Sequence, residues 1–168
     1  MKYDRMTFWL HVALAFAVSA QMMFGLVMDA PRPGVPIGGT GSSFFEIHRI
    51  FGPVVLVVLC AHWLWQLSGR ASNGMRSLYP WAFRRAAAAS TPSSGKKRLG
   101  TLSGAIQGIG LLIATLMGAT GLVMFFVMTG DGGLPANLSA MREIHSMAAV
   151  FLWIYLGFHL LISLLLHI

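Results

Sequence analysis

The sequence has very few charged residues for its length. Only 10% of its 168 residues are Asp, Glu, Lys or Arg, whereas 56% are hydrophobic and the mean hydropathy is +0.70. A soluble domain carries about 25% charged residues, because it must cover a surface that faces water. The composition therefore excludes an ordinary soluble domain and indicates a protein whose main solvent is lipid.

Cysteine is almost absent. Cys60 is the one cysteine of the chain and lies inside an apolar run. It cannot form an intrachain disulfide, and a C-x-x-C-H site for covalent haem attachment is excluded. Any haem in this protein must therefore be held without a thioether bond. We interpret Cys60 as a small, buried apolar residue.

Acidic residues are also scarce. The chain has five Asp and Glu and twelve Lys and Arg, which gives a formal net charge of +7. Such an excess of base is typical of nucleic-acid-binding proteins, but the cations fall between the apolar runs, so we expect no nucleic-acid partner. No carboxylate lies in the middle of an apolar run, which disfavours a relay that moves protons along mixed Asp, Glu and His.

Four apolar runs are present, at about 7–28, 44–67, 99–128 and 141–167. Each reaches the roughly 20 residues that a membrane helix needs. The first run exceeds the 7–15 apolar residues of a signal peptide, so we expect a true helix there. The sequence predicts an all-α, integral membrane four-helix bundle that forms a single domain over residues 1–168.

The charges predict the orientation of this bundle. Seven cations lie in the connection at about 68–98, and Lys2 and Arg5 precede the first run. The connections at 29–43 and 129–140 are rich in Gly and Pro and carry few cations. Because cytoplasmic segments carry an excess of Lys and Arg, we expect both termini and the basic 68–98 loop to be cytoplasmic.

Five of the six histidines lie in or at the edges of the apolar runs: His11, His48, His62, His145 and His159. Fourteen residues separate the two histidines of the second run, and fourteen separate those of the fourth. On a helix this step returns to within about 40° of the same face and advances about 21 Å. The second and fourth helices run in the same direction. We therefore expect His48 and His145 at an outer level, and His62, His159 and His11 at an inner level.

Opposed histidines at two levels favour haem. Zinc takes four ligands, or three and a water, at close sequence spacing, which this sequence does not offer. Haem iron takes two axial ligands from opposite sides of a planar ring. We therefore predict two b-type haems. Two imidazoles saturate each iron, which suits electron transfer rather than oxygen binding. The alternative is a set of hydrogen-bonded core histidines.

Glycines follow the same register. Gly25 lies fourteen residues after His11, Gly52 lies one turn after His48, and Gly118 lies fourteen after Gly104 in the third run. We predict that Gly25, Gly52 and Gly118 leave room for the edge of a haem. Close helix packing through small residues spaced four apart is the alternative for the third run, and both can hold.

The order of these motifs resembles a known family. The segments are Tyr3-Asp4-Arg5 with His11, Ile47-His48-Arg49-Ile50-Phe51-Gly52, Gly118 to Met124, and Glu143-Ile144-His145 through Gly157-Phe158-His159. They resemble the bacterial cytochrome b561 family and its relatives, the cytochrome b subunits of nickel-iron hydrogenases and formate dehydrogenases.

The resemblance implies that His48 and His145 ligate the outer haem iron and that His11 and His159 ligate the inner one. In the family the position of His62 is often Arg. A histidine there opens a second assignment, with His62 and His159 as the inner pair. We favour His11, because the first-helix segment matches the family, and expect His62 beside a haem propionate or a quinone.

The resemblance also implies a multi-pass protein of the bacterial inner membrane, surrounded by lipid. We expect an electron-transfer subunit rather than a self-contained enzyme, passing electrons between quinone and a redox partner protein that is periplasmic or bound in a complex. A stand-alone superoxide:quinone oxidoreductase is an alternative. It needs a positive outer funnel for the anion, but the outer connections hold more acid than base. A non-redox membrane scaffold is the second alternative.

Overall fold

Four long helices form the protein. The structure, a computed structural model, describes residues 4–30, 40–71, 74–82, 95–129 and 133–167, and these contain no strand. The long helices are α1 (Arg5–Val27), α2 (Thr40–Leu67), α5 (Gly95–Val127) and α6 (Ala140–His167). A short helix α3 (Met75–Leu78) and a 3-10 turn η1 (Ala136–Leu138) lie in the connections. The prediction of an all-α fold is confirmed.

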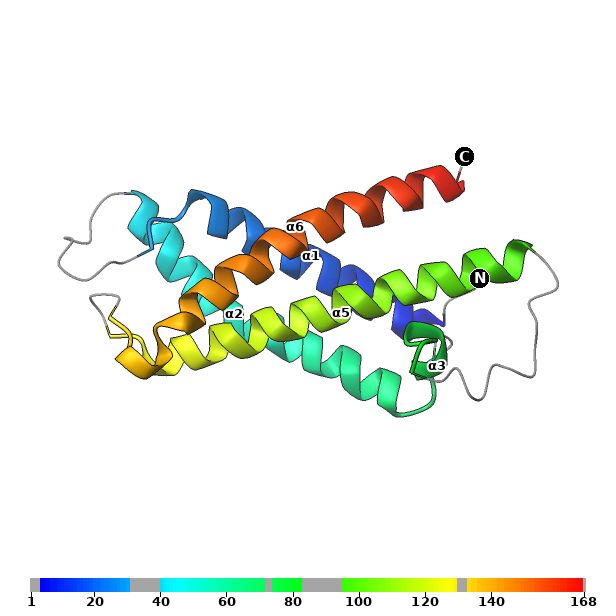
Figure 1. Cartoon of the computed structure of the whole chain (residues 1–168), viewed down its shortest axis with the longest axis horizontal. Helices are drawn as coiled ribbons and strands as arrows, with labels where there is room; N and C mark the ends of the chain where they lie inside the picture. The colour runs from blue at the N-terminus through cyan, green and yellow to red at the C-terminus, as the bar shows by residue number, and fades with distance from the viewer. Residues whose placement is uncertain (1–3, 31–39, 72–73, 83–94, 130–132, 168) are drawn as a thin grey trace.

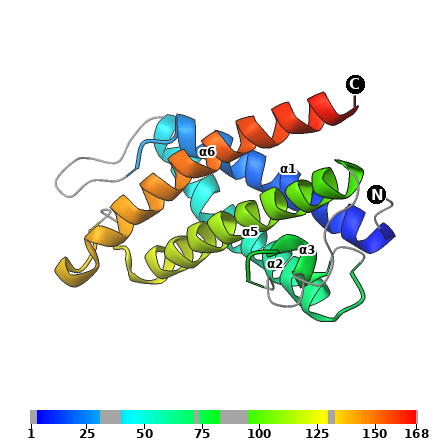
Figure 2. The same cartoon turned by 45° about the vertical axis from the view of Figure 1, so that its right-hand side comes forward.

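The four helices alternate in direction (Figures 1 and 2). α1 begins and α6 ends at one end of the bundle, where α3 also lies. α1 packs mainly on α2, α5 mainly on α6, and α2 joins the two pairs through α5. α2 and α6 therefore run in the same direction, as the two-level placement of the histidines requires.

Two helices begin earlier than the apolar pattern indicates. α2 begins at Thr40 rather than near 44, and α5 begins at Gly95 rather than near 99, so the Lys96–Arg98 run is helical. Hydropathy marks the part of a helix that lies in lipid, whereas backbone hydrogen bonding continues past that boundary. Among the cations of the basic end, Lys2, Arg84, Arg85 and the side chains of 96–98 lie outside the described residues.

The N-terminus of α1 is fixed by its own sequence. Asp4 accepts hydrogen bonds from the backbone N–H of Thr7 at 2.7 Å and from its hydroxyl at 2.6 Å. This satisfies one of the backbone donors that a helix leaves free at its start. The indole of Trp65 on α2 donates to the same Thr7 hydroxyl at 3.0 Å. The cap therefore also joins α1 to α2 close to His11.

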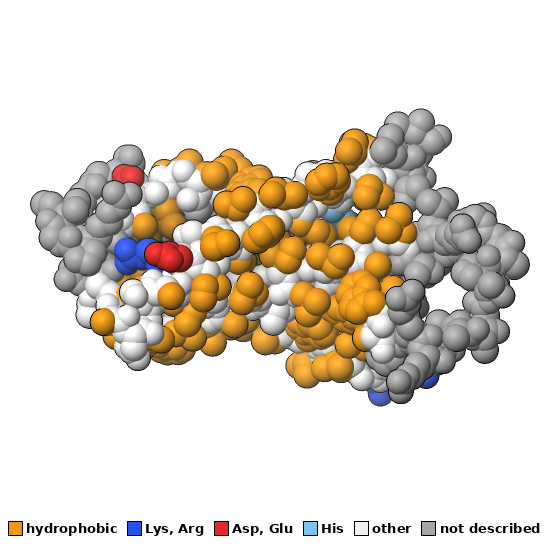
Figure 3. Space-filling view, viewed as in Figure 1, with side chains coloured by type: hydrophobic (Ala, Val, Ile, Leu, Met, Phe, Trp, Pro, Cys, Tyr) orange, Lys and Arg blue, Asp and Glu red, His pale blue; other side chains and the backbone are white. Residues whose placement is uncertain are grey.

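The outer surface of the bundle is apolar. Figure 3 shows hydrophobic side chains over the middle of the molecule and charged side chains near its ends. The four candidate spans have mean hydropathies of 1.8 to 2.2 and few buried residues. This confirms a membrane four-helix bundle. Cys60 is exposed on this surface, so the expectation that it is buried was wrong: its helix turns it away from the other helices.

The interior is small and lies between the two histidine levels of α2. Leu59, Leu111 and Ala114 are buried together, and Leu14, Leu56 and Trp63 pack against them. The Trp63 indole donates to the Thr115 hydroxyl at 2.9 Å, which ties α2 to α5. Hydrogen bonds between helices hold membrane bundles together where lipid removes the hydrophobic drive for association.

The segment around α3 closes the basic end of the bundle. Leu78 and Tyr79 are buried, and the Tyr79 hydroxyl donates to the Gly108 carbonyl at 3.3 Å. A Cβ added at Gly104 or Gly108 would collide with the backbone of Ser77 or Leu78. The close-packing interpretation is confirmed for these two glycines, although their partner is the α3 segment rather than another long helix.

Candidate functional site

Two histidine rings meet at the outer level. His48 of α2 and His145 of α6 have ring centroids 6.4 Å apart, with their planes at 90°. Both side chains are only partly covered by protein. The two helices that carry them are not directly adjacent, because each packs mainly on another neighbour. The rings therefore face each other across the interior of the bundle.

The ring of His48 is held by α1. Its Nδ1 lies 3.2 Å from the backbone carbonyl of Gln21, and the Gln21 side-chain amide donates to the His48 carbonyl at 2.7 Å. A carbonyl can only accept, so Nδ1 carries the proton and Nε2 is the unprotonated nitrogen. A Cβ at Gly52 would lie 3.3 Å from the Gln21 amide nitrogen. Glycine at 52 therefore gives Gln21 the room to approach.

The ring of His145 is held by α5. Its Nδ1 lies 2.8 Å from the Thr120 hydroxyl oxygen, and Thr120 is buried. A Cβ at Gly121 would lie 3.2 Å from Cε1 of the same ring. Thr120 and Gly121 thus place the imidazole between them, one by a hydrogen bond and the other by the absence of a side chain.

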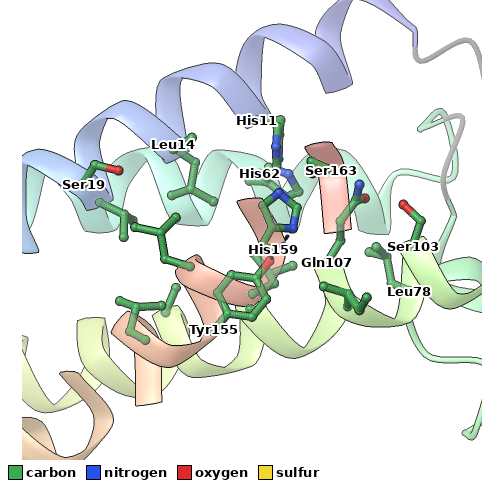
Figure 4. A pocket seen from close by; sticks show the side chains of 18 of the residues that line it. His11, Leu14, Ser19, His62, Leu78, Ser103, Gln107, Tyr155, His159 and Ser163 are labelled. Carbon is green, nitrogen blue, oxygen red and sulfur yellow. Dashed lines mark hydrogen bonds between the residues drawn. The ribbon is translucent and has the colours of Figure 1, made fainter. Parts of the chain in front are cut away.

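A second pair lies at the inner level. His11 of α1 and His159 of α6 have ring centroids 5.9 Å apart, with their planes at 59°. They line a cavity of about 470 Å³ that extends between all four long helices (Figure 4). The Tyr155 ring stacks on His159 at 5.5 Å, with its hydroxyl 3.5 Å from Nδ1. A volume of this size is in the usual range for ligand and cofactor sites.

A family comparison gives this arrangement its context. The model of the family described as prokaryotic cytochrome b561 matches residues 2–168. The chain belongs to the prokaryotic cytochrome b561 family. No curated protein and no solved structure matches it. Membership identifies the chain as a multi-pass membrane protein that binds haem b and transfers electrons, and the resemblance inferred from the motifs is confirmed.

In this cytochrome b561 family member, His62 lies beside the inner pair. It lines the same cavity and is buried, with 8% of its surface exposed, and its Nδ1 has no hydrogen-bond partner among the described residues. Gln66, one turn further along α2, is also buried and has an unpartnered amide oxygen. Figure 4 shows His11, His62 and His159 grouped together in the cavity.

The predicted glycines fall in different environments. A Cβ at Gly25 would lie 3.7 Å from Cε1 of His48, so this glycine faces the outer pair. Gly52 lies against Gln21, and Gly118 lies against Leu56 and Leu59 of α2 rather than against a histidine. Whether Gly25, Gly52 and Gly118 border a haem stays a prediction.

Sequence reasoning missed the residues that hold the rings. Gln21, Thr120, Gly121 and Tyr155 each contact a histidine, yet the register of fourteen residues selects none of them. A signal was available for the first two, because polar side chains inside apolar helices usually have a function or a partner. Among the described residues no group of three or more His, Cys, Asp or Glu can hold a metal ion.

Proposed function

We propose that this protein holds two b haems and passes electrons between quinone and a redox partner at its outer face. His48 and His145 are the proposed ligands of the outer haem, and His11 and His159 those of the inner haem. The observation that carries the proposal is the meeting of two histidine pairs at two levels of one bundle. The levels lie about 21 Å apart along α6, which is most of the roughly 30 Å hydrocarbon core.

The spacing of the rings supports axial ligation. An imidazole nitrogen binds a metal at about 2 Å, so two rings on opposite sides of one iron have their ligating nitrogens about 4 Å apart. Each ring centroid lies further from the iron than its ligating nitrogen does. The distance between the two centroids is therefore longer than the distance between the two nitrogens. The centroid distances of 6.4 Å and 5.9 Å agree with that arrangement.

The hydrogen bonds at the outer level support it further. Metal-ligating histidines almost always donate their second ring N–H to a carboxylate, a backbone carbonyl or a water. His48 does so toward the Gln21 carbonyl at 3.2 Å, and His145 lies 2.8 Å from the Thr120 hydroxyl. Both rings therefore keep Nε2 for a metal.

The inner cavity supports a second haem and gives His62 a role. Its lining is mainly apolar around Leu14, Leu111 and Leu152 and becomes polar around Gln66, Gln107 and Ser163. An apolar body with a polar edge matches a haem whose propionates point to one side. We propose that His62, with an unpartnered buried Nδ1, binds a propionate or a quinone oxygen at that polar edge.

Haem iron would supply a one-electron couple, and His48 with His145 and His11 with His159 would hold one such group at each level. We propose that both ends of the chain are cytoplasmic and that the protein lies in the bacterial inner membrane. Support comes from the sequence, where Lys2, Arg5 and the seven Lys and Arg of the 68–98 connection outnumber the cations of the other two connections, since the positive-inside rule places such segments in the cytoplasm. Family membership argues against the non-redox scaffold.

Quinol reduction of the purified holoprotein tests the electron-transfer claim. A short-chain quinol should reduce the haem within seconds, one quinol supplying two electrons and two protons and leaving quinone. His159→Ala should slow this reduction at least tenfold, whereas Phe158→Leu, a change at a neighbouring exposed side chain, should not. Haem that dithionite reduces but quinol does not would contradict the quinone role.

A further inference from the structure

Thr120 makes two kinds of hydrogen bond at once. Its hydroxyl donates to the α5 backbone, with the Leu116 carbonyl at 2.8 Å and the Met117 carbonyl at 3.1 Å. The same oxygen lies 2.8 Å from Nδ1 of His145. A hydroxyl has one hydrogen, and a carbonyl can only accept. The hydrogen therefore points to the backbone, and the Thr120 oxygen accepts the Nδ1–H of His145.

The Thr120 hydroxyl therefore fixes the tautomer of His145 from another helix, and the Met117 carbonyl of the same helix also forms a hydrogen bond with this ring. With the proton on Nδ1, the nitrogen that remains for a metal is Nε2. The His145 ring cannot rotate about its Cβ–Cγ bond without breaking the 2.8 Å hydrogen bond to Thr120. Thr120 is 5% exposed, so its hydroxyl is largely covered by the protein. The Gln21 carbonyl does the same for His48, at 3.2 Å.

The two groups that accept from the Nδ1 atoms, the Gln21 carbonyl and the Thr120 hydroxyl, belong to different helices and hold the two rings in different orientations. Gln21 lies on α1 and Thr120 on α5, and the ring planes that they hold are at 90°. At the inner level the planes are at 59°, and the contact to His159 Nδ1 is a phenol at 3.5 Å, the limit of a hydrogen bond. A phenol can donate or accept, so this contact does not select a tautomer as the Thr120 contact does.

We propose that Thr120 is the positioning residue of the outer site: it sets the tautomer of His145 and, with the Gln21 carbonyl, holds the two outer imidazole planes perpendicular. The proposal rests on the proposed function, in which His48 and His145 share one haem iron. Thr120 acts through His145 and touches neither substrate nor iron.

Perpendicular axial imidazoles have a spectroscopic signature. In low-spin ferric haem the anisotropy of the electron paramagnetic resonance spectrum depends on the angle between the two ligand planes, and it is greatest when they are perpendicular. An acceptor that is hydrogen-bonded to Nδ1–H also makes the imidazole a stronger electron donor to the iron. This favours the ferric state. Loss of the Thr120 hydroxyl should therefore lower the anisotropy and raise the outer reduction potential.

The chain offers a matched control. Thr115 lies on the same helix, donates its hydroxyl to the Leu111 carbonyl at 2.7 Å and accepts the Trp63 indole N–H at 2.9 Å. Like Thr120, it donates to the backbone of its own helix and accepts one ring N–H, but from a tryptophan instead of a histidine. Thr115→Val removes an equivalent hydrogen bond without touching either histidine pair.

The experiment is electron paramagnetic resonance and a redox titration of purified holoprotein carrying Thr120→Val, Thr120→Ser or Thr115→Val. Thr120→Val should keep both haems but move the most anisotropic ferric signal to a lower maximum g value and raise one potential. Thr120→Ser and Thr115→Val should match the parent protein. Thr120→Ala carries the same expectation as Thr120→Val if the latter does not fold.

Three results separate the claims. Two haems with a signal and potential unchanged in Thr120→Val and Thr120→Ala would overturn the positioning role and leave the proposed function intact. An equal change in Thr115→Val would also overturn it, because the effect would then come from bundle packing. A parent protein without haem would instead overturn the proposed function.

Discussion

His48 and His145 face each other with ring centroids 6.4 Å apart and planes at 90°, although they come from helices that pack mainly on other neighbours. Each ring is held at Nδ1 by a third or fourth helix, through the Gln21 carbonyl and the Thr120 hydroxyl. All four helices are therefore needed to place one histidine pair. This explains how α5, which carries no histidine, contributes to a site built from imidazoles.

The orientation of the bundle leads to a labelling prediction. In a Cys60→Ala background, Ser68→Cys at the basic end should react with a membrane-impermeant thiol reagent only after the membrane is opened. Ser139→Cys at the other end should react in intact spheroplasts. Both serines are exposed, so access depends on the side of the membrane alone. The reverse pattern would contradict cytoplasmic termini.

Two alanine variants distinguish the inner ligands. His11→Ala should lower the haem content to about one per chain, because the ring that faces His159 at 5.9 Å is lost. His62→Ala should keep two haems and change the potential or the quinol reaction. Haem per chain is measured as the pyridine haemochrome in preparations with equal helical circular dichroism. Loss of a haem in His62→Ala and its retention in His11→Ala would establish the other assignment.

Gly121 should tolerate a side chain poorly. A Cβ there lies 3.2 Å from Cε1 of His145, so Gly121→Ala must displace the ring, and overpacking of this kind costs about 1–3 kcal/mol. Gly157→Ala on α6 is the control, since nothing lies within 4 Å of its added Cβ. Thermal unfolding of the holoproteins should show a loss of stability in the first variant and none in the second. Equal stabilities would refute the close contact.

The stability of the protein should fall in strong base because of Tyr79. Its burial raises the pKa of the phenol to about 12, above the ordinary value of about 10. Between these values the unfolded chain releases the proton while the folded chain retains it, so the free energy of unfolding falls as pH rises through this window. Tyr79→Phe should be less stable at pH 8 by about 1 kcal/mol, from the lost bond to Gly108. Its deficit should shrink toward pH 12, and parallel curves would rule this out.

The sequence predicted the helices and the levels of the histidines because both depend on local periodicity. Four long apolar runs determine four spans, and a spacing of fourteen residues places two histidines on one face of a helix at any packing angle. The alternation in direction then follows because each apolar helix crosses the membrane once, so the next helix must cross it in the opposite direction. These features do not depend on how the helices rotate against one another.

The contacts that hold the rings could not be predicted in the same way. Whether Thr120 or Thr115 faces a histidine depends on the rotation of α5, and both make the same bond to their own backbone. The register pointed to Gly118, but α5 lies between α2 and α6, and Gly118 faces Leu56 while Gly121 faces His145. The docking of α3 on Gly104 and Gly108 was also missed, because a four-residue helix has no periodicity to detect.

The haem content of the purified protein tests the central claim most directly. A dithionite-reduced minus oxidised spectrum, with pyridine haemochrome quantitation, should show low-spin b haem at two per chain. One haem per chain would contradict the two-level arrangement, and none in a folded preparation supplied with haem would contradict the whole account.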